Sequence, residues 1–355
     1  MSRFFTKTLS ALEPYTPGEQ PQDMKYIKLN TNESPFEPSA KAKAVAAEHE
    51  RALNLYSDPS CKLVIDKLAE LYDVDPENVI LGNGSDELLF FSFRAFCDED
   101  RKAVFPDISY GFYPVFAQIN KVPYNEIPLK EDLSIDTSDY KETGSTIYIA
   151  NPNAPTGLTL PVSTIEELVK SHPDDVVVID EAYVDFGGDS CVRLTKKYDN
   201  ILVIQTFSKS RSLAGARIGF AIGSKVLIND MNTVKFSVNP YNINSMTMAM
   251  AYGVLCDEEQ TKANCRIIAE NRDNTIKALK ELGFETTDSK SNFIFAKSDK
   301  ISGGELYSEL KKKGILVRHF DKERIREYNR ISVGTKEQMD AFLKAVSEIL
   351  EETSR

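Results

Sequence analysis

The sequence of 355 residues contains no tryptophan, only three histidines and only five cysteines, and these scarcities exclude several kinds of site. The histidines, His49, His172 and His319, lie too far apart along the chain for the ligand spacing of a zinc site. The cysteines are odd in number and form no CxxC pair, so they predict the reduced thiols of a cytoplasmic protein and no disulfide framework. We therefore expect no metal centre and no catalytic role for either residue type.

Long apolar runs and an excess of positive charge are also lacking. No stretch reaches the roughly 18 uninterrupted apolar residues that a membrane helix needs, and the first nine residues lack the apolar core of a signal peptide. The net charge of −11 argues against nucleic acid or an anionic membrane as the main partner. An anionic ligand must therefore be held by a few local cations.

The chain is long for one hydrophobic core and is predicted to have three parts. Residues 1–38 contain many prolines and form an N-terminal arm, residues 39–235 form a large domain, and residues 236–355 form a smaller α+β domain with which the arm is grouped. Strands and helices alternate in the large domain, which predicts an α/β fold with a mainly parallel sheet wrapped by helices. The predicted strands are 79–81, 146–150, 176–179 and 201–204, and the predicted helices are 60–72, 85–97 and 163–171, the last opened by a capping box at Ser163–Glu166.

A lysine follows the predicted strand 201–204 at a short distance. Lys209 lies beside Ser208, and Arg217 comes eight positions later. A lysine just past a strand end can form a Schiff base with an aldehyde cofactor, and hydroxyl groups with an arginine suit the phosphate of such a cofactor. Taken alone, this segment could equally be a surface loop with two cations.

Two further polar side chains follow strands at equal intervals. Asn151, Asp180 and Lys209 are separated by 29 residues each, which suits one strand–helix–strand step. Ligands of parallel sheets gather at the carboxyl ends of the strands, so we expect these side chains to converge there. Asp180 and Glu181 could instead bind a metal ion as a pair. Pairing of Asp180 with a cofactor is the stronger interpretation, because Lys209 follows it at the same 29-residue interval.

The ordered motifs NPNAPTG (residues 151–157), DEAY (180–183) and SKSRSLAGAR (208–217) are hard to explain by chance. With them the chain resembles the fold-type I pyridoxal-phosphate aminotransferases over nearly its whole length. It is most similar to the histidinol-phosphate aminotransferase family within them. The segments that carry this narrower resemblance are PYTPG (14–18), KLNTNESP (28–35), YSDP (56–59), GNGSDE (82–87) and RISVGT (330–335).

The resemblance implies a pyridoxal 5'-phosphate cofactor and a role for several residues around its ring. Lys209 would form the Schiff base and then move the proton between substrate and cofactor. Asp180 would pair with the protonated ring nitrogen, a contact of about 1.5–3 kcal/mol. Asn151 and Tyr183 would hydrogen-bond the phenolic oxygen, and Tyr110 would stack on the ring.

The cofactor phosphate is expected at the start of the helix that begins near residue 85. Free backbone N–H groups at a helix N-terminus bind phosphate, which assigns Gly84, Ser85 and Asp86 to this site. Ser208 and Arg217 would complete it. The resemblance further implies that Tyr56 reaches this phosphate from a second subunit, and hence a homodimer with shared sites.

The resemblance also implies the substrates, which are L-histidinol phosphate or imidazole-acetol phosphate on one side and glutamate or 2-oxoglutarate on the other, in histidine biosynthesis. Arg330 and Arg318 would bind their anionic groups, because the planar guanidinium suits a carboxylate and a phosphate equally. Tyr15 and Asn32 on the arm would close over this anion.

The sequence departs from the family pattern at several positions and leaves alternatives open. Ala154, Ala216 and Ser57 stand where the family commonly has Asn, Leu and Pro. Tyr113 is a rival of Tyr110 for the stacking position, and Arg324 and Arg326 lie close to the proposed substrate arginines. The alternative functions are an aromatic or broad-range aminotransferase, a threonine-phosphate decarboxylase, or a binding protein without activity.

Overall fold

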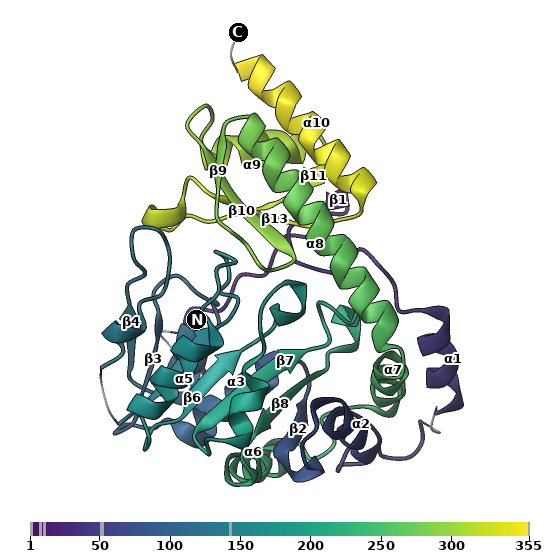
Figure 1. The fold of residues 1–355 in the computed structure, drawn as a ribbon, viewed down its shortest axis with the longest axis vertical. Helices are drawn as coiled ribbons and strands as arrows, with labels where there is room; N and C mark the ends of the chain where they lie inside the picture. Colours follow the sequence, from purple (N-terminus) through teal and green to yellow (C-terminus); the bar gives the residue numbers. More distant parts are fainter. Residues whose placement is uncertain (1–2, 7–8, 10–11, 50–52, 142–143, 354–355) are drawn as a thin grey trace.

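The computed structural model describes residues 3–6, 9, 12–49, 53–141 and 144–353. A large sheet with its helices occupies the lower half of Figure 1, and a small sheet with its helices lies above it. Helix α8 (Glu258–Glu281) runs from one half to the other. The cavity described below is lined by residues of the large half and of the N-terminal arm.

Seven strands form the large sheet in the described part of the chain. In spatial order they are β2 (Val79–Gly82), β8 (Gly219–Gly223), β7 (Ile201–Thr206), β6 (Val177–Asp180), β5 (Ser145–Ala150), β3 (Lys102–Pro106) and β4 (Tyr124–Ile127). Only β8 runs antiparallel to its neighbours, which confirms the mainly parallel α/β sheet. The strands β5, β6 and β7 are buried along their whole length, as their continuous apolar sequences require for a sheet covered on both faces.

Helices cover both faces of this sheet and one side of the small sheet (Figure 1). They are α1 (Ala40–Glu48), α2 (Lys62–Tyr72), α3 (Ser85–Phe96), α4 (Tyr113–Asn120), α5 (Val162–Ser171), α6 (Lys225–Val238), α7 (Ser245–Leu255), α8, α9 (Gly303–Lys312) and α10 (Lys336–Thr353). None of the helices in the described ranges is long and apolar enough to cross a membrane.

The capping box expected at Ser163 is wrong. Helix α5 begins one residue earlier, at Val162, and its N-cap is Pro161. The proline holds an extended backbone, and its carbonyl accepts the N–H groups of Thr164 and Ile165. Ser163 therefore lies inside the first turn, where its side chain cannot cap the helix.

The small sheet contains β12 (Arg318–His319), β13 (Asn329–Ser332), β10 (Phe293–Ser298) and β9 (Phe284–Thr286), in this order. The arm joins this half, because β1 (Ile27–Lys28) pairs in parallel with β11 (Ile315–Leu316). Helix α10 packs its apolar stripe into the same core, which includes Met339, Phe342 and Ile349.

The domain boundary at residue 236 stays a prediction. Helix α7 follows that boundary in sequence, yet Met248, Ala251 and Val254 belong to the core cluster of the large sheet. Gly253 in the same helix faces the backbone of α1, where an added Cβ would lie 2.2 Å from the carbonyl oxygen of Ala42. The close approach of these two helices therefore depends on a residue without a side chain.

We expect Gly253→Ala to lower the free energy of unfolding by about 1–3 kcal/mol, because the methyl group would push α7 away from α1. Denaturant unfolding measures this loss. Gly215→Ala is the matched control, since nothing lies within 4 Å of its added Cβ, and it should change stability by less than about 0.5 kcal/mol. Equal effects of the two substitutions would contradict the packing described for α7.

Candidate active site

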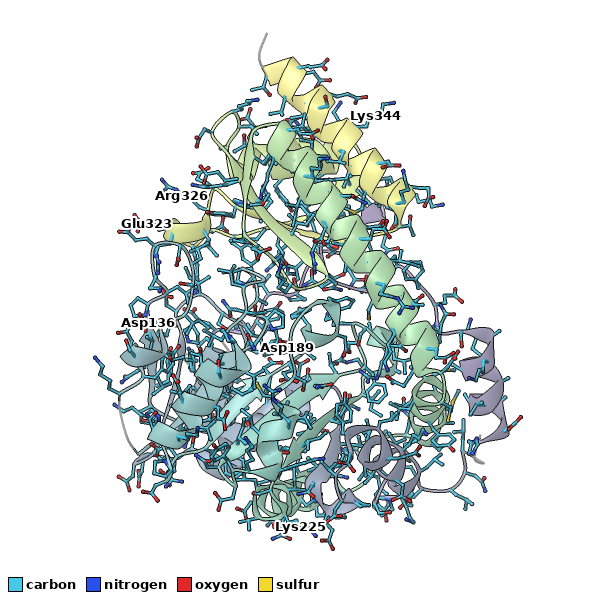
Figure 2. The ribbon with its side chains drawn as sticks, in the orientation of Figure 1. Asp136, Asp189, Lys225, Glu323, Arg326 and Lys344 are labelled. Atoms are coloured by element: carbon cyan, nitrogen blue, oxygen red, sulfur yellow. The ribbon has the colours of Figure 1, made fainter. Side chains whose placement is uncertain are left out.

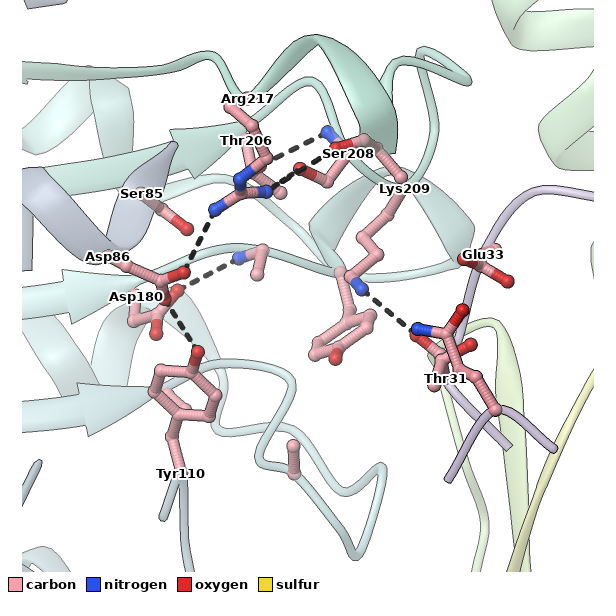
Figure 3. A pocket seen from close by; sticks show the side chains of 16 residues that line it. Thr31, Glu33, Ser85, Asp86, Tyr110, Asp180, Thr206, Ser208, Lys209 and Arg217 are labelled. Atoms are coloured by element: carbon pink, nitrogen blue, oxygen red, sulfur yellow. Dashed lines mark hydrogen bonds and ion pairs between the residues drawn. The ribbon is translucent and has the colours of Figure 1, made fainter. Parts of the chain in front are cut away.

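The carboxyl ends of three neighbouring strands line one cavity of about 260 Å³. Ala150, Asp180 and Thr206 are the last residues of β5, β6 and β7, and all three face this cavity. Parallel strands end at the same edge of a sheet, which brings these three positions together. Figure 3 shows the cavity with Lys209 and the arm on one side and the start of α3 on the other.

Lys209 lies on the loop after β7 with its amine inside the cavity. Its Nζ donates a hydrogen bond to the carbonyl oxygen of Thr31 (3.3 Å) and lies 5.9 Å from the centre of the Tyr183 ring. Burial lowers the pKa of this amine to about 8, and the nearby charge of Arg330 acts in the same direction. An amine with this pKa is partly neutral near pH 8 and can react as a nucleophile.

Asp180 lies at the floor of the cavity and is only 5% exposed. The hydroxyl of Tyr113 donates to its Oδ2 (3.1 Å), and the N–H of Ala182 donates to its Oδ1 (3.2 Å). Burial raises the pKa of this carboxyl to about 6, and the two hydrogen bonds oppose that rise. A buried carboxylate is stabilised by a cationic partner, and the protonated ring nitrogen of a cofactor would be such a partner.

The start of α3 forms one side of the cavity together with Arg217. Its N-cap, Gly84, has φ +80° and no capping side chain, which leaves the first N–H groups of the helix free. An added Cβ on Gly84 would lie 2.5 Å from the Nη2 of Arg217, so a larger residue would fill this space. Arg217 donates to the Oγ of Ser208 (3.4 Å) and pairs with Asp86 (3.0 Å). Cation, hydroxyl and free N–H groups together fit a phosphate.

The two candidate stacking tyrosines take different places. Tyr110 lines the cavity, and its hydroxyl donates to Asp86 (2.6 Å). Tyr113 is fully buried at the start of α4, and its hydroxyl is bonded to Asp180. This geometry favours Tyr110 as the residue that stacks on the cofactor ring. Tyr113 instead donates a hydrogen bond to Asp180, a role that the sequence did not indicate.

Asn151 is buried directly after β5 and is not among the residues that line the cavity, and its bond to the ring oxygen of the cofactor stays a prediction. Its Nδ2 donates to the carbonyl oxygen of Leu160 (3.1 Å), and its Oδ1 accepts the N–H of Leu160 (2.8 Å). The side chain thus joins the two ends of the turn after β5. Ala154 from the same turn lines the cavity instead.

Arg318 and Arg330 are directly opposite each other on the paired strands β12 and β13. Both guanidinium groups lie over the ring of Phe320, at 5.9 and 5.8 Å from its centre. The arm holds them through carbonyl oxygens: Thr16 and Pro17 accept from Arg318 and Asn30 accepts from Arg330.

Arg330 keeps unused hydrogen-bonding capacity. Its Nε is buried and has no hydrogen-bond partner among the described residues. Tyr15, from the arm, stacks on Phe112 with the ring centres 4.2 Å apart. Neither arginine is among the residues that line the cavity itself, and neither is Tyr15.

The two rival arginines have other partners. Arg324 pairs with Asp107 (2.9 Å) and donates to the carbonyl oxygens of Leu129 and Lys130, so it ties the small half to the loop after β3. Arg326 pairs with Glu327 and lies at the outer edge of the molecule (Figure 2).

Two other predicted residues lie outside the cavity lining of this chain. Asn32 is buried, and its amide forms hydrogen bonds with Tyr183 and Ser332, while its contact with the substrate anion stays a prediction. Tyr56 is 84% exposed and stacks on Tyr241 with ring centres 4.5 Å apart.

The cavity also contains residues that sequence reasoning missed. Gln20, Thr31 and Glu33 of the arm line it beside Lys209. Glu33 pairs with Lys28 (2.7 Å), and this contact helps to hold the pKa of its carboxyl below the ordinary value although burial opposes it. The motif KLNTNESP could have indicated them, because it contains all of these residues except Gln20. No cluster of metal-binding side chains occurs in the residues that the structure describes.

We expect the rate at which the cofactor-free protein captures pyridoxal 5'-phosphate to rise with pH and to level off above about pH 8. The lowered pKa of Lys209 means that its amine is protonated and unreactive below this value and neutral above it. Stopped-flow absorbance between pH 6.5 and 9.5 measures the rate, and Lys209→Ala is the control that should show no capture. A rate that still rises tenfold per pH unit at pH 9.5 would contradict the lowered pKa.

Comparisons with known proteins place the chain in a family. A family model described as "Aminotransferase class I and II" matches residues 24–346. The histidinol-phosphate aminotransferase of Brachyspira hyodysenteriae is 46% identical over 352 residues, 99% of each protein. That of Clostridium beijerinckii is 44% identical over 351 residues, 99% of this chain and 98% of the relative.

The fold of the chain also matches that of a solved structure. The crystal structure of histidinol-phosphate aminotransferase from Sinorhizobium meliloti in complex with pyridoxal-5'-phosphate has a TM-score of 0.89 at 21% identity, and the match covers 99% of both chains. This likeness confirms the predicted fold-type I architecture. The chain therefore belongs to the class I and II aminotransferases, and within them to the histidinol-phosphate aminotransferase family.

Proposed function

We propose that this aminotransferase uses pyridoxal 5'-phosphate to transfer an amino group between L-histidinol phosphate and 2-oxoglutarate, giving imidazole-acetol phosphate and glutamate, as a cytoplasmic step of histidine biosynthesis. The observation that carries the proposal is the pairing of Arg318 with Arg330 on the small sheet, beside a cavity that contains Lys209 and Asp180. The full-length similarity to relatives named for this reaction supports it.

The residues of the cavity fit the cofactor in type and position. Lys209 would hold the aldehyde carbon, Asp180 the ring nitrogen, and Ser85, Ser208 and Arg217 the phosphate. When bound, the cofactor supplies an electron sink for cleavage of a bond next to the substrate nitrogen. Asp180 would stabilise a proton on the ring nitrogen, because its carboxylate is buried and held by hydrogen bonds from Tyr113 and Ala182.

Around the ring, Tyr110 would pack against one face, and Tyr183 would present its hydroxyl at the edge. Lys209, once released, would carry the proton, since an amine with a pKa near 8 can both accept and return one at neutral pH.

The arginine pair would bind the anionic end of either substrate. A guanidinium group forms two parallel hydrogen bonds with a carboxylate or a phosphate. Arg330 has a buried Nε without a partner among the described residues, and Arg318 now donates only to carbonyl oxygens of the arm. A stronger, charged acceptor would replace these carbonyls, so the same pair can serve glutamate and the phosphorylated amine in turn.

We expect L-histidinol phosphate to convert the cofactor-loaded protein to its amino form at least about tenfold faster than L-phenylalanine, because two guanidinium groups attract a phosphate with nearly two negative charges more strongly than the single carboxylate of phenylalanine. The visible absorbance band of the bound cofactor reports this conversion, and phosphothreonine is tested in parallel. Lys209→Ala is the control that should not turn over.

Each alternative function has its own outcome in this experiment. An equal or faster response to phenylalanine would identify an aromatic or broad-range aminotransferase. Release of carbon dioxide from phosphothreonine would identify a decarboxylase. A band that no amine changes would identify a binding protein without activity.

We also propose that two copies of the chain form a homodimer in which Tyr56 reaches the phosphate of its partner's cofactor. Tyr56 is highly exposed and does not line the cavity of its own chain. The loop that contains it is joined to the segment before α7, since Ser57 donates to the carbonyl oxygen of Ile243 (2.6 Å). Exposed apolar side chains occur on both segments, including Leu55, Tyr241 and Met246.

Mixing two inactive variants, Lys209→Ala and Tyr56→Ala, should restore about a quarter of the activity, because half of the random dimers would then contain one intact site out of two. The assay uses a cofactor concentration at which Tyr56→Ala alone is unsaturated. If Tyr56 served its own chain, the mixture would stay as inactive as its components. Analytical ultracentrifugation of each variant checks that the dimer is retained.

A further inference from the structure

The arm residue Asn32 has a backbone held in an unusual conformation. Its φ is +56°, in the left-handed region that asparagine tolerates better than most residues. Its N–H donates to the Oγ of Ser332 (2.8 Å), and its carbonyl oxygen accepts from the Nδ2 of Asn292 (2.9 Å). The residue is 1% exposed. The small sheet therefore fixes the place of this side chain.

The side-chain amide of Asn32 has a defined direction. Its Oδ1 accepts the hydroxyl hydrogen of Ser332 (2.8 Å), and its Nδ2 donates to the hydroxyl oxygen of Tyr183 (3.0 Å). Since Tyr183 accepts this bond, its own hydroxyl hydrogen is left for another acceptor. No such acceptor is recorded within the described residues, and Tyr183 lines the cavity.

We propose that Asn32 is a positioning residue, which holds the hydroxyl oxygen of Tyr183 as an acceptor so that this hydroxyl donates its hydrogen to the anionic ring oxygen of the cofactor. The proposal rests on the cofactor and on the place of Tyr183 in the proposed function, but not on the identity of the substrate. An amide turned the other way would accept the tyrosine hydrogen and remove the donor from the cavity.

The charges around Tyr183 support a hydroxyl that stays protonated. Burial raises the pKa of this phenol, while the charge of Arg330 and the bond from Asn32 oppose the rise, and the carboxylates of Asp180 and Asp86 add to it. The amine of Lys209 lies over the ring. The net direction is upward, so the group acts as a hydrogen donor at neutral pH.

Asn32→Asp tests the proposal, because aspartate has the same shape, tolerates the same backbone conformation and cannot donate when ionised. The readout is the pH titration of the visible absorbance of the cofactor-loaded protein, without substrate. Loss of the donor destabilises the form with full negative charge on the ring oxygen, so we expect the midpoint to rise by about one pH unit, a tenfold shift in the proton equilibrium.

Asn30→Asp is the matched control. Asn30 is equally buried on the same arm, but its amide donates to the carbonyl oxygen of Glu19, and the control should leave the midpoint nearly unchanged. Ser332→Ala, which removes the group that orients the amide, should shift the midpoint in the same direction as Asn32→Asp but less. It keeps the proposal testable if Asn32→Asp does not fold.

A double substitution distinguishes an effect of Asn32→Asp that acts through the tyrosine hydroxyl from a direct effect of the added negative charge. If Asn32 acts through the tyrosine hydroxyl, Asn32→Asp should add no further shift in a Tyr183→Phe protein. A shift of equal size in both backgrounds, or no shift in either, would overturn the proposal. The titration needs no substrate, so a protein that rejects histidinol phosphate can still confirm the role of Asn32, and a failure of one proposal is distinguishable from a failure of the other.

Discussion

A carboxylate buried as deeply as that of Asp180 is unfavourable unless its environment supplies hydrogen bonds and positive charge. The residues around it meet this need in part: Tyr113 and the N–H of Ala182 donate to it, and Lys209 contributes a nearby charge. The same burial lowers the pKa of Lys209. One physical constraint, the burial of both groups beyond the carboxyl ends of β6 and β7, thus makes the carboxyl ready for a cationic ring and the amine ready to react.

The N-terminal arm contributes to this burial. Its carbonyl oxygens accept hydrogen bonds from Lys209, Arg330 and Arg318, three cationic side chains that would otherwise repel one another. The arm also pairs with β11 and reaches Tyr183 through Asn32, so it links the small sheet to the end of β6. These contacts are carbonyl-to-cation bonds that an anionic ligand can replace. The arm therefore holds these cations in place through contacts that a substrate anion would replace.

Much of the site was predictable because it depends on spacing. A buried apolar run followed by a polar residue marks a strand end, and parallel strands bring such ends together, which is why Asp180 and Lys209 were found from the sequence. Asn151 obeys the same spacing, but the spacing does not give the direction of its side chain, which depends on the hydrogen bonds to Leu160 in the turn after β5. Tyr113 was considered only as a stacking residue, because nothing in a sequence says which buried hydroxyl will meet which carboxylate.

The sequence by itself determined the α/β architecture, the family and the lysine, carboxylate and arginine that suit the cofactor, because apolar periodicity and motif order are local properties of the chain. Only the tertiary structure decided which side chains face the cavity. Tyr110 lines the cavity, whereas Tyr113 does not. Arg324 forms an ion pair with Asp107, and the amide of Asn32 donates to Tyr183. The physical reason is that some hydrogen-bond partners, such as Asn32 and Ser332, lie 300 residues apart in the sequence and become neighbours only when the two sheets and the arm have packed.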